Sequence, residues 1–125
     1  MKKIISTVKA PAAIGPYSQG AAGSGIIITS GQLPIDPETG VMPETIEEQT
    51  RQSLENVKAV LEEAGADLDQ VIKTTVFLND MNDFAAMNGV YAGFFKEGSC
   101  PARSAVEVAR LPKDALVEIE AIAVL

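Results

Sequence analysis

Three segments of this chain carry apolar residues at both odd and even positions, a pattern that restricts the kind of sheet they can form. They are IIIT, VIKTTVFL and IEAIAVL, at residues 26–29, 71–78 and 119–125. Because successive side chains of a strand point to opposite faces, both faces of the predicted sheet are apolar. Only two helices are predicted, and they can cover one face. We therefore expect the other face to lie against another copy of the chain.

Local signals place the two helices between the predicted strands. Thr45 followed by Glu48 is typical of a capping box, an apolar stripe runs from residue 46 to 64, and Gly65 marks the end. A second helix is expected after Asp80 or Asn82, and the residues expected on its apolar side are Phe84, Met87, Tyr91, Phe94 and Phe95. Strands are predicted at residues 2–7, 17–21, 25–31 and 71–78, with two more within 101–124. The order βββαβαββ predicts one α+β domain over residues 1–125, a six-stranded mixed sheet with two helices on one face.

The closing stretch, PARSAVEVARLPKDALVEIEAIAV, reads as two strands joined by a Pro-Lys-Asp turn. If Leu111 faces Leu116 in a hairpin, Glu118 lies opposite Ala109, six residues from Arg103 along the strand. At ~3.3 Å per residue, Arg103 and Glu118 are then about 20 Å apart. Within one chain they would not form one site. They are either unrelated or brought together across a subunit boundary.

Composition excludes several classes of function. The net charge of −7 disfavours binding to nucleic acid or to anionic membranes, and no apolar run is long enough to span a bilayer. The chain has no histidine and one cysteine, so neither a His-based triad nor a thiolate metal cluster is expected. No signal peptide is predicted, and a single cysteine fits a reducing, cytoplasmic setting. We expect no metal and no cofactor.

Each polar residue of interest also has an ordinary structural interpretation. Arg103 could be a strand-end charge paired with a surface acid, or an anchor for a substrate carboxylate. Glu118 and Glu120 share one strand face and could simply be solvated. Tyr17 could pack in its Gly-Pro-Tyr turn, and Gly31 could serve only a turn. The residue types alone leave these alternatives open.

Long motifs in a fixed order resemble the Rid (reactive intermediate deaminase) family of the YjgF type. They are AIGPYSQG, ITSGQLP, QSLENVKAVLEEAG, VIKTTVFLNDMNDFAAMN and the closing stretch, and they cover almost the whole chain. The resemblance implies a chorismate-mutase-like fold and a homotrimer with active sites between subunits. It also implies hydrolysis of reactive 2-imino acids, such as 2-iminobutanoate and 2-iminopropanoate, to 2-keto acids and ammonia without a cofactor. Pyridoxal-phosphate dehydratases would supply these substrates.

The resemblance also implies roles for individual residues. Arg103 matches the family arginine that binds the substrate carboxylate, and Glu118 matches the glutamate that handles the hydrolytic water. Many members have cysteine where this chain has Ala105, but the family's contact there is mainly through the backbone amide. Four further residues match positions that line the cleft: Tyr17, Ser30, Gly31 and Asn88.

Two other functions remain open from the sequence. The chain could be a non-catalytic regulator that binds small 2-keto or imino acids, which would need Arg103 but not Glu118. An RNA-directed activity is the other alternative, and the net charge of −7 disfavours it.

Overall fold

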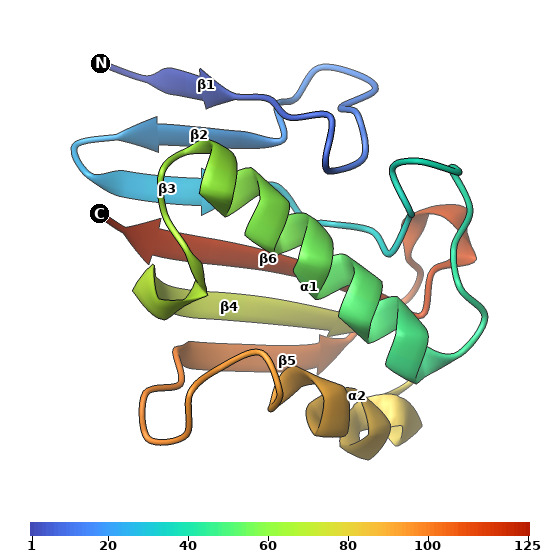
Figure 1. The fold of residues 1–125 in the computed structure, drawn as a ribbon. Helices are drawn as coiled ribbons and strands as arrows, with labels where there is room; N and C mark the ends of the chain where they lie inside the picture. Colours follow the sequence, from blue (N-terminus) through green and yellow to red (C-terminus); the bar gives the residue numbers. More distant parts are fainter.

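One six-stranded sheet forms the frame of the fold in the computed structural model, which describes residues 1–125 (Figure 1). The sheet order is β1-β2-β3-β6-β4-β5, in which only β4 and β5 are parallel. The predicted α+β class and the order βββαβαββ are confirmed. The elements are β1 Lys3–Ile5, β2 Gly20–Gly23, β3 Ile26–Thr29, α1 Ile46–Glu63, β4 Val71–Leu78, α2 Phe84–Tyr91, β5 Ala102–Glu107 and β6 Val117–Val124, with short 3-10 turns η1 Leu68–Gln70, η2 Met81–Asp83 and η3 Pro112–Asp114.

Helix α1 forms where the local signals predicted it and packs diagonally across the sheet (Figure 1). The Thr45 hydroxyl accepts a hydrogen bond from the backbone N–H of Glu48 at 3.2 Å, which caps the first turn. Beyond the helix, Gly65 has a φ of 87°, a conformation that glycine adopts without strain. Leu54 and Val57 are fully buried in the core beneath the helix.

One buried hydroxyl on α1, that of Thr50, has no hydrogen-bond partner. A buried polar group without a partner costs about 1–3 kcal/mol, and valine has nearly the same shape as threonine. We therefore expect Thr50→Val to raise the free energy of unfolding by about 1 kcal/mol, measured by urea denaturation at equal protein concentration. Thr74→Val is the matched control, because the Thr74 hydroxyl lies 2.7 Å from the Tyr91 hydroxyl and its loss should destabilise the protein. A destabilised Thr50→Val would contradict the assignment.

The predicted closing hairpin is wrong, because β4 lies between β5 and β6. Arg103 pairs with Thr74 in the parallel β4–β5 ladder, and Thr74 pairs with Ala121 in the antiparallel β4–β6 ladder. The segment between β5 and β6 therefore crosses the end of β4 rather than folding back as a tight turn. Alternating side chains suit either pairing equally well, so the strand pattern did not distinguish the two arrangements.

The first three strands are shorter than predicted, and Tyr17 lies in a loop rather than in β2. The buried Gln19 side chain explains the late start of β2, because it bonds to the preceding loop. Its Nε2 donates to the carbonyls of Thr7, Ala10 and Pro11 at 3.0, 3.2 and 2.7 Å. The loop backbone is satisfied by this side chain instead of by a strand partner.

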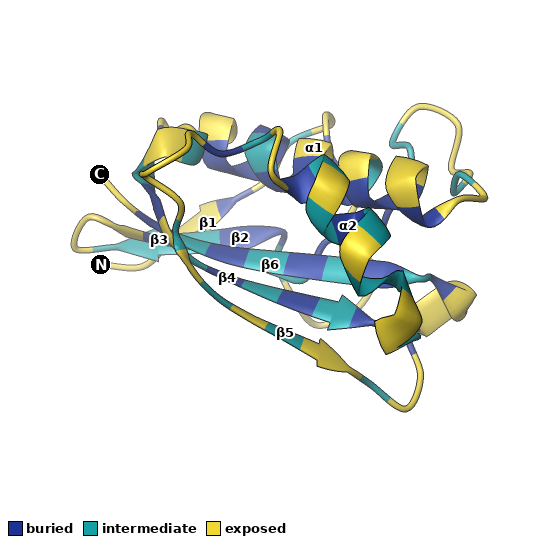
Figure 2. Ribbon diagram, turned by 90° about the horizontal axis from the view of Figure 1, so that it is seen from below, coloured by how far each residue is buried: buried dark blue, intermediate teal, exposed yellow.

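Both helices lie on the same face of the sheet, which leaves the other face open in the single chain (Figure 2). On the helix side Ile27 and Ile119 are completely buried. Alternation puts the neighbouring residues on the open face, where large apolar side chains remain 40–52% exposed. We call this surface the open face; its exposed apolar residues are Ile4, Ile26, Ile28, Val106 and Val124.

Candidate active site

The structure separates the seven predicted site residues into two groups. Four of them line one pocket of about 710 Å³: Tyr17, Ser30, Gly31 and Glu118. The other three lie around the parallel edge of the sheet, where Arg103 and Ala105 are on β5 and Asn88 is on α2. We call these the glutamate group and the arginine group.

Arg103 and Glu118 point to opposite faces of the sheet. Arg103 pairs with Thr74, which is buried on the helix side, whereas Glu118 alternates with the buried Val117 and Ile119 and so points to the open face. Arg103 lies two strands away from Glu118 across the sheet, because β4 is between them, and three residues away along the strand direction. These two offsets together place their Cα atoms about 14 Å apart. This value replaces the 20 Å expected from the hairpin.

Glu118 is held against the backbone at Gly31. A Cβ atom added to Gly31 would lie 2.8 Å from Cδ and 3.0 Å from Oε2 of Glu118, so only glycine leaves room for the carboxylate there. Burial raises the pKa of the Glu118 carboxyl above its ordinary value, and Glu120 on the same strand face raises it further. The carboxyl group is therefore poised to exchange a proton at a higher pH than an exposed glutamate.

The other two members of the glutamate group differ in how fully hydrogen bonds hold their side chains. Ser30 is fixed, because its hydroxyl donates to the carbonyl of Ser18 and its backbone N–H donates to the carbonyl of Gln19 at 2.9 Å. Tyr17 is 53% exposed, and its hydroxyl oxygen accepts only a long bond of 3.4 Å from the backbone N–H of Ile14. The phenolic hydroxyl of Tyr17 remains available as a donor at the pocket.

Arg103 lies under α2 and has no carboxylate partner. Its Nη1 donates to Oδ1 of Asn88 at 2.6 Å, while the single ion pair of the structure joins Arg110 to Asp114. The predicted alternative of a surface ion pair is therefore not formed. A guanidinium that is positioned but not neutralised is suited to bind an anion such as a carboxylate.

Two aromatic residues that were predicted only to lie on the apolar side of α2 also hold Arg103. The guanidinium carbon lies 4.7 Å from the ring centre of Tyr91 and 5.4 Å from that of Phe84. Burial raises the pKa of Tyr91, while its hydrogen bond to Thr74 and the charge of Arg103 oppose that rise. The spacing of residues 84, 88 and 91 is the sequence signal that could have revealed this contact, because it places Asn88 on the same side of the helix as both rings.

Ala105 lies two residues beyond Arg103 on β5 and pairs with Val76. It therefore shares the helix-side face with Arg103, and no side-chain thiol is present at this position.

The fold and the motif residues define a member of one protein family. Residues 7–125 match the family model described as endoribonuclease L-PSP, Ribonuc_L-PSP, and the chain belongs to this family. Among its relatives, the 2-iminobutanoate/2-iminopropanoate deaminase of Salmonella typhimurium is 58% identical over 126 residues, which is 99% of this chain and 98% of that protein. The resemblance to Rid proteins of the YjgF type is thereby confirmed.

Solved structures agree with this assignment. The chain superimposes on Escherichia coli TdcF with bound serine at a TM-score of 0.94, with 54% identity and coverage of 98% of both chains. For the Escherichia coli YjgF gene product the TM-score is 0.93 with 57% identity, again covering 98% of both chains. These solved structures share the fold of this chain, which confirms the predicted fold class. No helix of the structure is long and apolar enough to cross a membrane.

Proposed function

We propose that this protein hydrolyses reactive 2-imino acids, including 2-iminobutanoate and 2-iminopropanoate, to 2-keto acids and ammonia. The observation that carries the proposal is the unneutralised Arg103, fixed by Asn88 and two aromatic rings. A relative that is named for this reaction and is 58% identical over 99% of this chain supports the proposal. In the solved TdcF structure the bound molecule is serine, a small amino acid with a carboxylate that matches the chemistry of an arginine anchor.

The chemistry needs orientation more than a protein nucleophile. Arg103 grips the substrate carboxylate, and Glu118 accepts a proton as water adds to C2 of the protonated imine. The nitrogen then takes up a proton, the C2–N bond breaks with release of ammonia, and the former water oxygen loses its remaining proton to become the oxygen of the 2-keto acid. Tyr17, Ser30 and Gly31 line the cleft beside Glu118, and Asn88 with the backbone of Ala105 completes the side that binds the carboxylate.

One complete site requires two chains in this proposal. Arg103 and Glu118 point to opposite faces of the sheet, so a site of the size of a small imino acid draws them from neighbouring subunits. The apolar open face supplies the contact surface for a homotrimer. In the cytoplasm, pyridoxal-phosphate dehydratases would generate the substrate.

The family description names an endoribonuclease, which corresponds to the RNA-directed alternative. A net charge of −7 opposes binding to a polyanion, so imine hydrolysis is the better supported function. A non-catalytic regulator would bind 2-keto acids at Arg103 without any need for Glu118.

The direct test is release of 2-keto acid when a threonine dehydratase generates the imine in the assay. Addition of the protein should accelerate keto acid release beyond spontaneous hydrolysis, and catalytic amounts should suffice. Keto acid binding by calorimetry without acceleration would favour the regulator instead.

The proposed trimer predicts the effect of a charge on the open face. Ile28→Glu should yield monomers at micromolar concentration in light scattering, because it places a carboxylate in the middle of the apolar surface. Val8→Glu is the control, since Val8 is 93% exposed and outside the sheet strands. A wild-type protein that is monomeric at this concentration would contradict the assembly.

A further inference from the structure

A row of polar side chains is buried on the side of α1 that faces segment 32–43. Gln49, Ser53 and Asn56 are 5%, 0% and 1% exposed, and their spacing of four and three residues places them on one side of the helix. We call them the α1 polar row. Burying such groups is costly unless they form hydrogen bonds, so their partners indicate what they do.

The first partners are backbone carbonyls just after Gly31. The Ser53 hydroxyl donates to the carbonyl of Gln32 at 2.7 Å, and Nδ2 of Asn56 donates to the carbonyls of Leu33 and Ile35 at 2.9 Å each. Leu33 and Ile35 line the same pocket as Glu118. The helix therefore holds one wall of the pocket directly.

Gln49 bonds to the far end of this wall and to the strand that carries Glu118. Its Nε2 donates to the carbonyl of Pro43 at 2.8 Å, while its Oε1 accepts the backbone N–H of Leu116 at 2.8 Å. Leu116 immediately precedes β6. The α1 polar row thus connects the segment 32–43 with the start of β6 through a rigid helix.

The geometry around Gln32 joins this row to the candidate base. Gln32 and Ile119 exchange two backbone hydrogen bonds. The N–H of Gln32 donates to the carbonyl of Ile119 at 2.8 Å, and the N–H of Ile119 donates to the carbonyl of Gln32 at 3.3 Å. Gly31, which gives the Glu118 carboxylate its room, directly precedes Gln32. The Gln32 carbonyl, shared by Ser53 and Ile119, fixes this backbone beside the strand of Glu118.

We propose that Gln49, Ser53 and Asn56 are positioning residues for Glu118, which hold Gly31 and the pocket wall so that its carboxylate meets the attacking water in one geometry. This role rests on the proposed imine hydrolysis. None of the three side chains needs to touch substrate, because each acts through the backbone that it binds.

The titration of Glu118 can report the positioning role of the α1 polar row, because the charged groups around Glu118 stay the same when that row is substituted. Glu120 lies beside it on β6, and Lys113 of η3, Asp36 of the 32–43 segment and Tyr17 of the first loop line the same pocket. Substitutions in the α1 polar row alter none of these titratable groups. A change in the titration of Glu118 therefore reports its position and hydration.

The experiment compares Ser53→Ala and Asn56→Ala with Thr50→Val in the assembled protein. Thr50 is the matched control, because it is buried on the same helix and its side-chain hydroxyl forms no hydrogen bond. Ser53→Ala should lower kcat about tenfold with little change in KM, since a small displacement of a catalytic group has a large kinetic cost. Its acid limb in the pH profile should move to lower pH, because water that enters beside a loosened wall relieves the burial that raises the pKa of Glu118.

A carbon-detected NMR titration of Glu118 supplies a readout independent of turnover. The proposal predicts a lower pKa of Glu118 in Ser53→Ala and Asn56→Ala than in Thr50→Val. Unchanged titration in the folded variants overturns it, as does a loss of rate that matches only the unfolded fraction. If Asn56→Ala does not fold, Ser53→Ala, which removes one oxygen atom, decides the question. A wild-type protein without deaminase activity contradicts the proposed function, while the titration still decides the positioning role.

Discussion

Replacing Arg103 with alanine is expected to lower kcat/KM for 2-iminobutanoate by about 10²- to 10³-fold, the range typical of removing one partner of a desolvated charge pair. The guanidinium has no carboxylate neighbour in the protein, so its charge is available for the substrate. Arg103→Lys should lose less, because lysine keeps the charge but lacks the planar fork that binds a carboxylate through two bonds and stacks on Tyr91. Initial rates in the dehydratase-coupled assay measure both variants.

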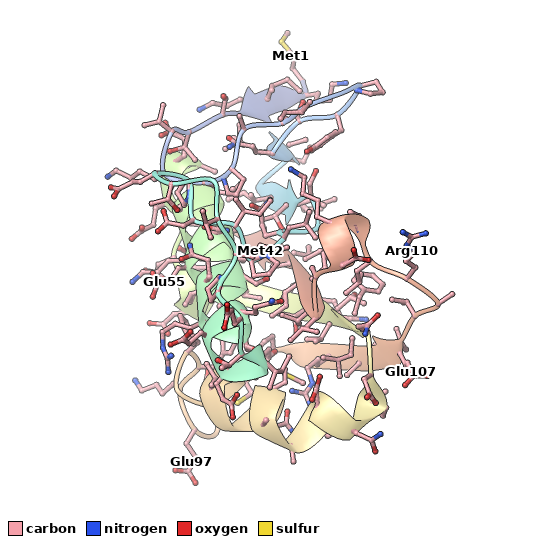
Figure 3. All side chains as sticks on the ribbon, turned by 90° about the vertical axis from the view of Figure 1, so that its right-hand side faces the viewer. Met1, Met42, Glu55, Glu97, Glu107 and Arg110 are labelled. Atoms are coloured by element: carbon pink, nitrogen blue, oxygen red, sulfur yellow. The ribbon has the colours of Figure 1, made fainter.

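Arg110→Ala is the matched control for this loss. Arg110 projects from the segment between β5 and β6 into solvent, and its side chain is 84% exposed beside Asp114 (Figure 3). It should retain wild-type activity, which separates the specific role of Arg103 from loss of one positive charge. Full activity of a correctly folded Arg103→Ala variant would eliminate the carboxylate anchor.

Glu118→Gln is expected to lower kcat by about 10²- to 10⁴-fold, the usual contribution of a general base. Glutamine keeps the shape that fits against Gly31 but accepts no proton from water. Glu120→Gln, on the same strand face, should reduce the rate far less. Activity in the wild type should fall as pH drops through the raised pKa of Glu118, because protonation removes the base; this acid limb therefore lies above that of an ordinary carboxyl group.

Mixing the two inactive variants tests whether both residues serve one site. For the proposed homotrimer, Arg103→Ala and Glu118→Gln subunits that are unfolded together and refolded should regain part of the wild-type rate, because some of the proposed clefts would then combine both intact residues from different chains. A mass-tagged variant confirms subunit exchange. If confirmed mixed assemblies stay inactive, Arg103 and Glu118 of one site do not come from different chains. The proposed shared site would then be wrong.

The sequence predicted those parts of the fold that depend on local signals. Helix α1 was placed by its cap at Thr45, its stripe and its stop at Gly65, all of which are written in neighbouring residues. The partner of β6 was predicted wrongly, because pairing joins distant segments and the alternating pattern of residues 117–124 suits either neighbour. Local patterns define an element, but not which strand lies beside it.

The candidate site shows the same division. Arg103 and Glu118 stood out because charged residues interrupt apolar strands, whereas Tyr91 was assigned to the apolar side of α2 and its stacking on Arg103 was missed. Gln49 and Asn56 were also missed, since polar residues on a helix normally face solvent and nothing nearby in sequence marks their carbonyl partners. Only the three-dimensional path of segment 32–43 reveals why these amides are buried.

In the proposed trimer, the placement of Arg103 and Glu118 on opposite faces of one sheet makes activity depend on correct assembly. The two residues of a single chain face away from each other, so a lone chain would form no complete site. A complete site would form only where neighbouring chains meet correctly, and a misassembled or isolated chain would be inactive rather than partly active. The proposed hydrolysis would therefore begin only when the trimer is complete.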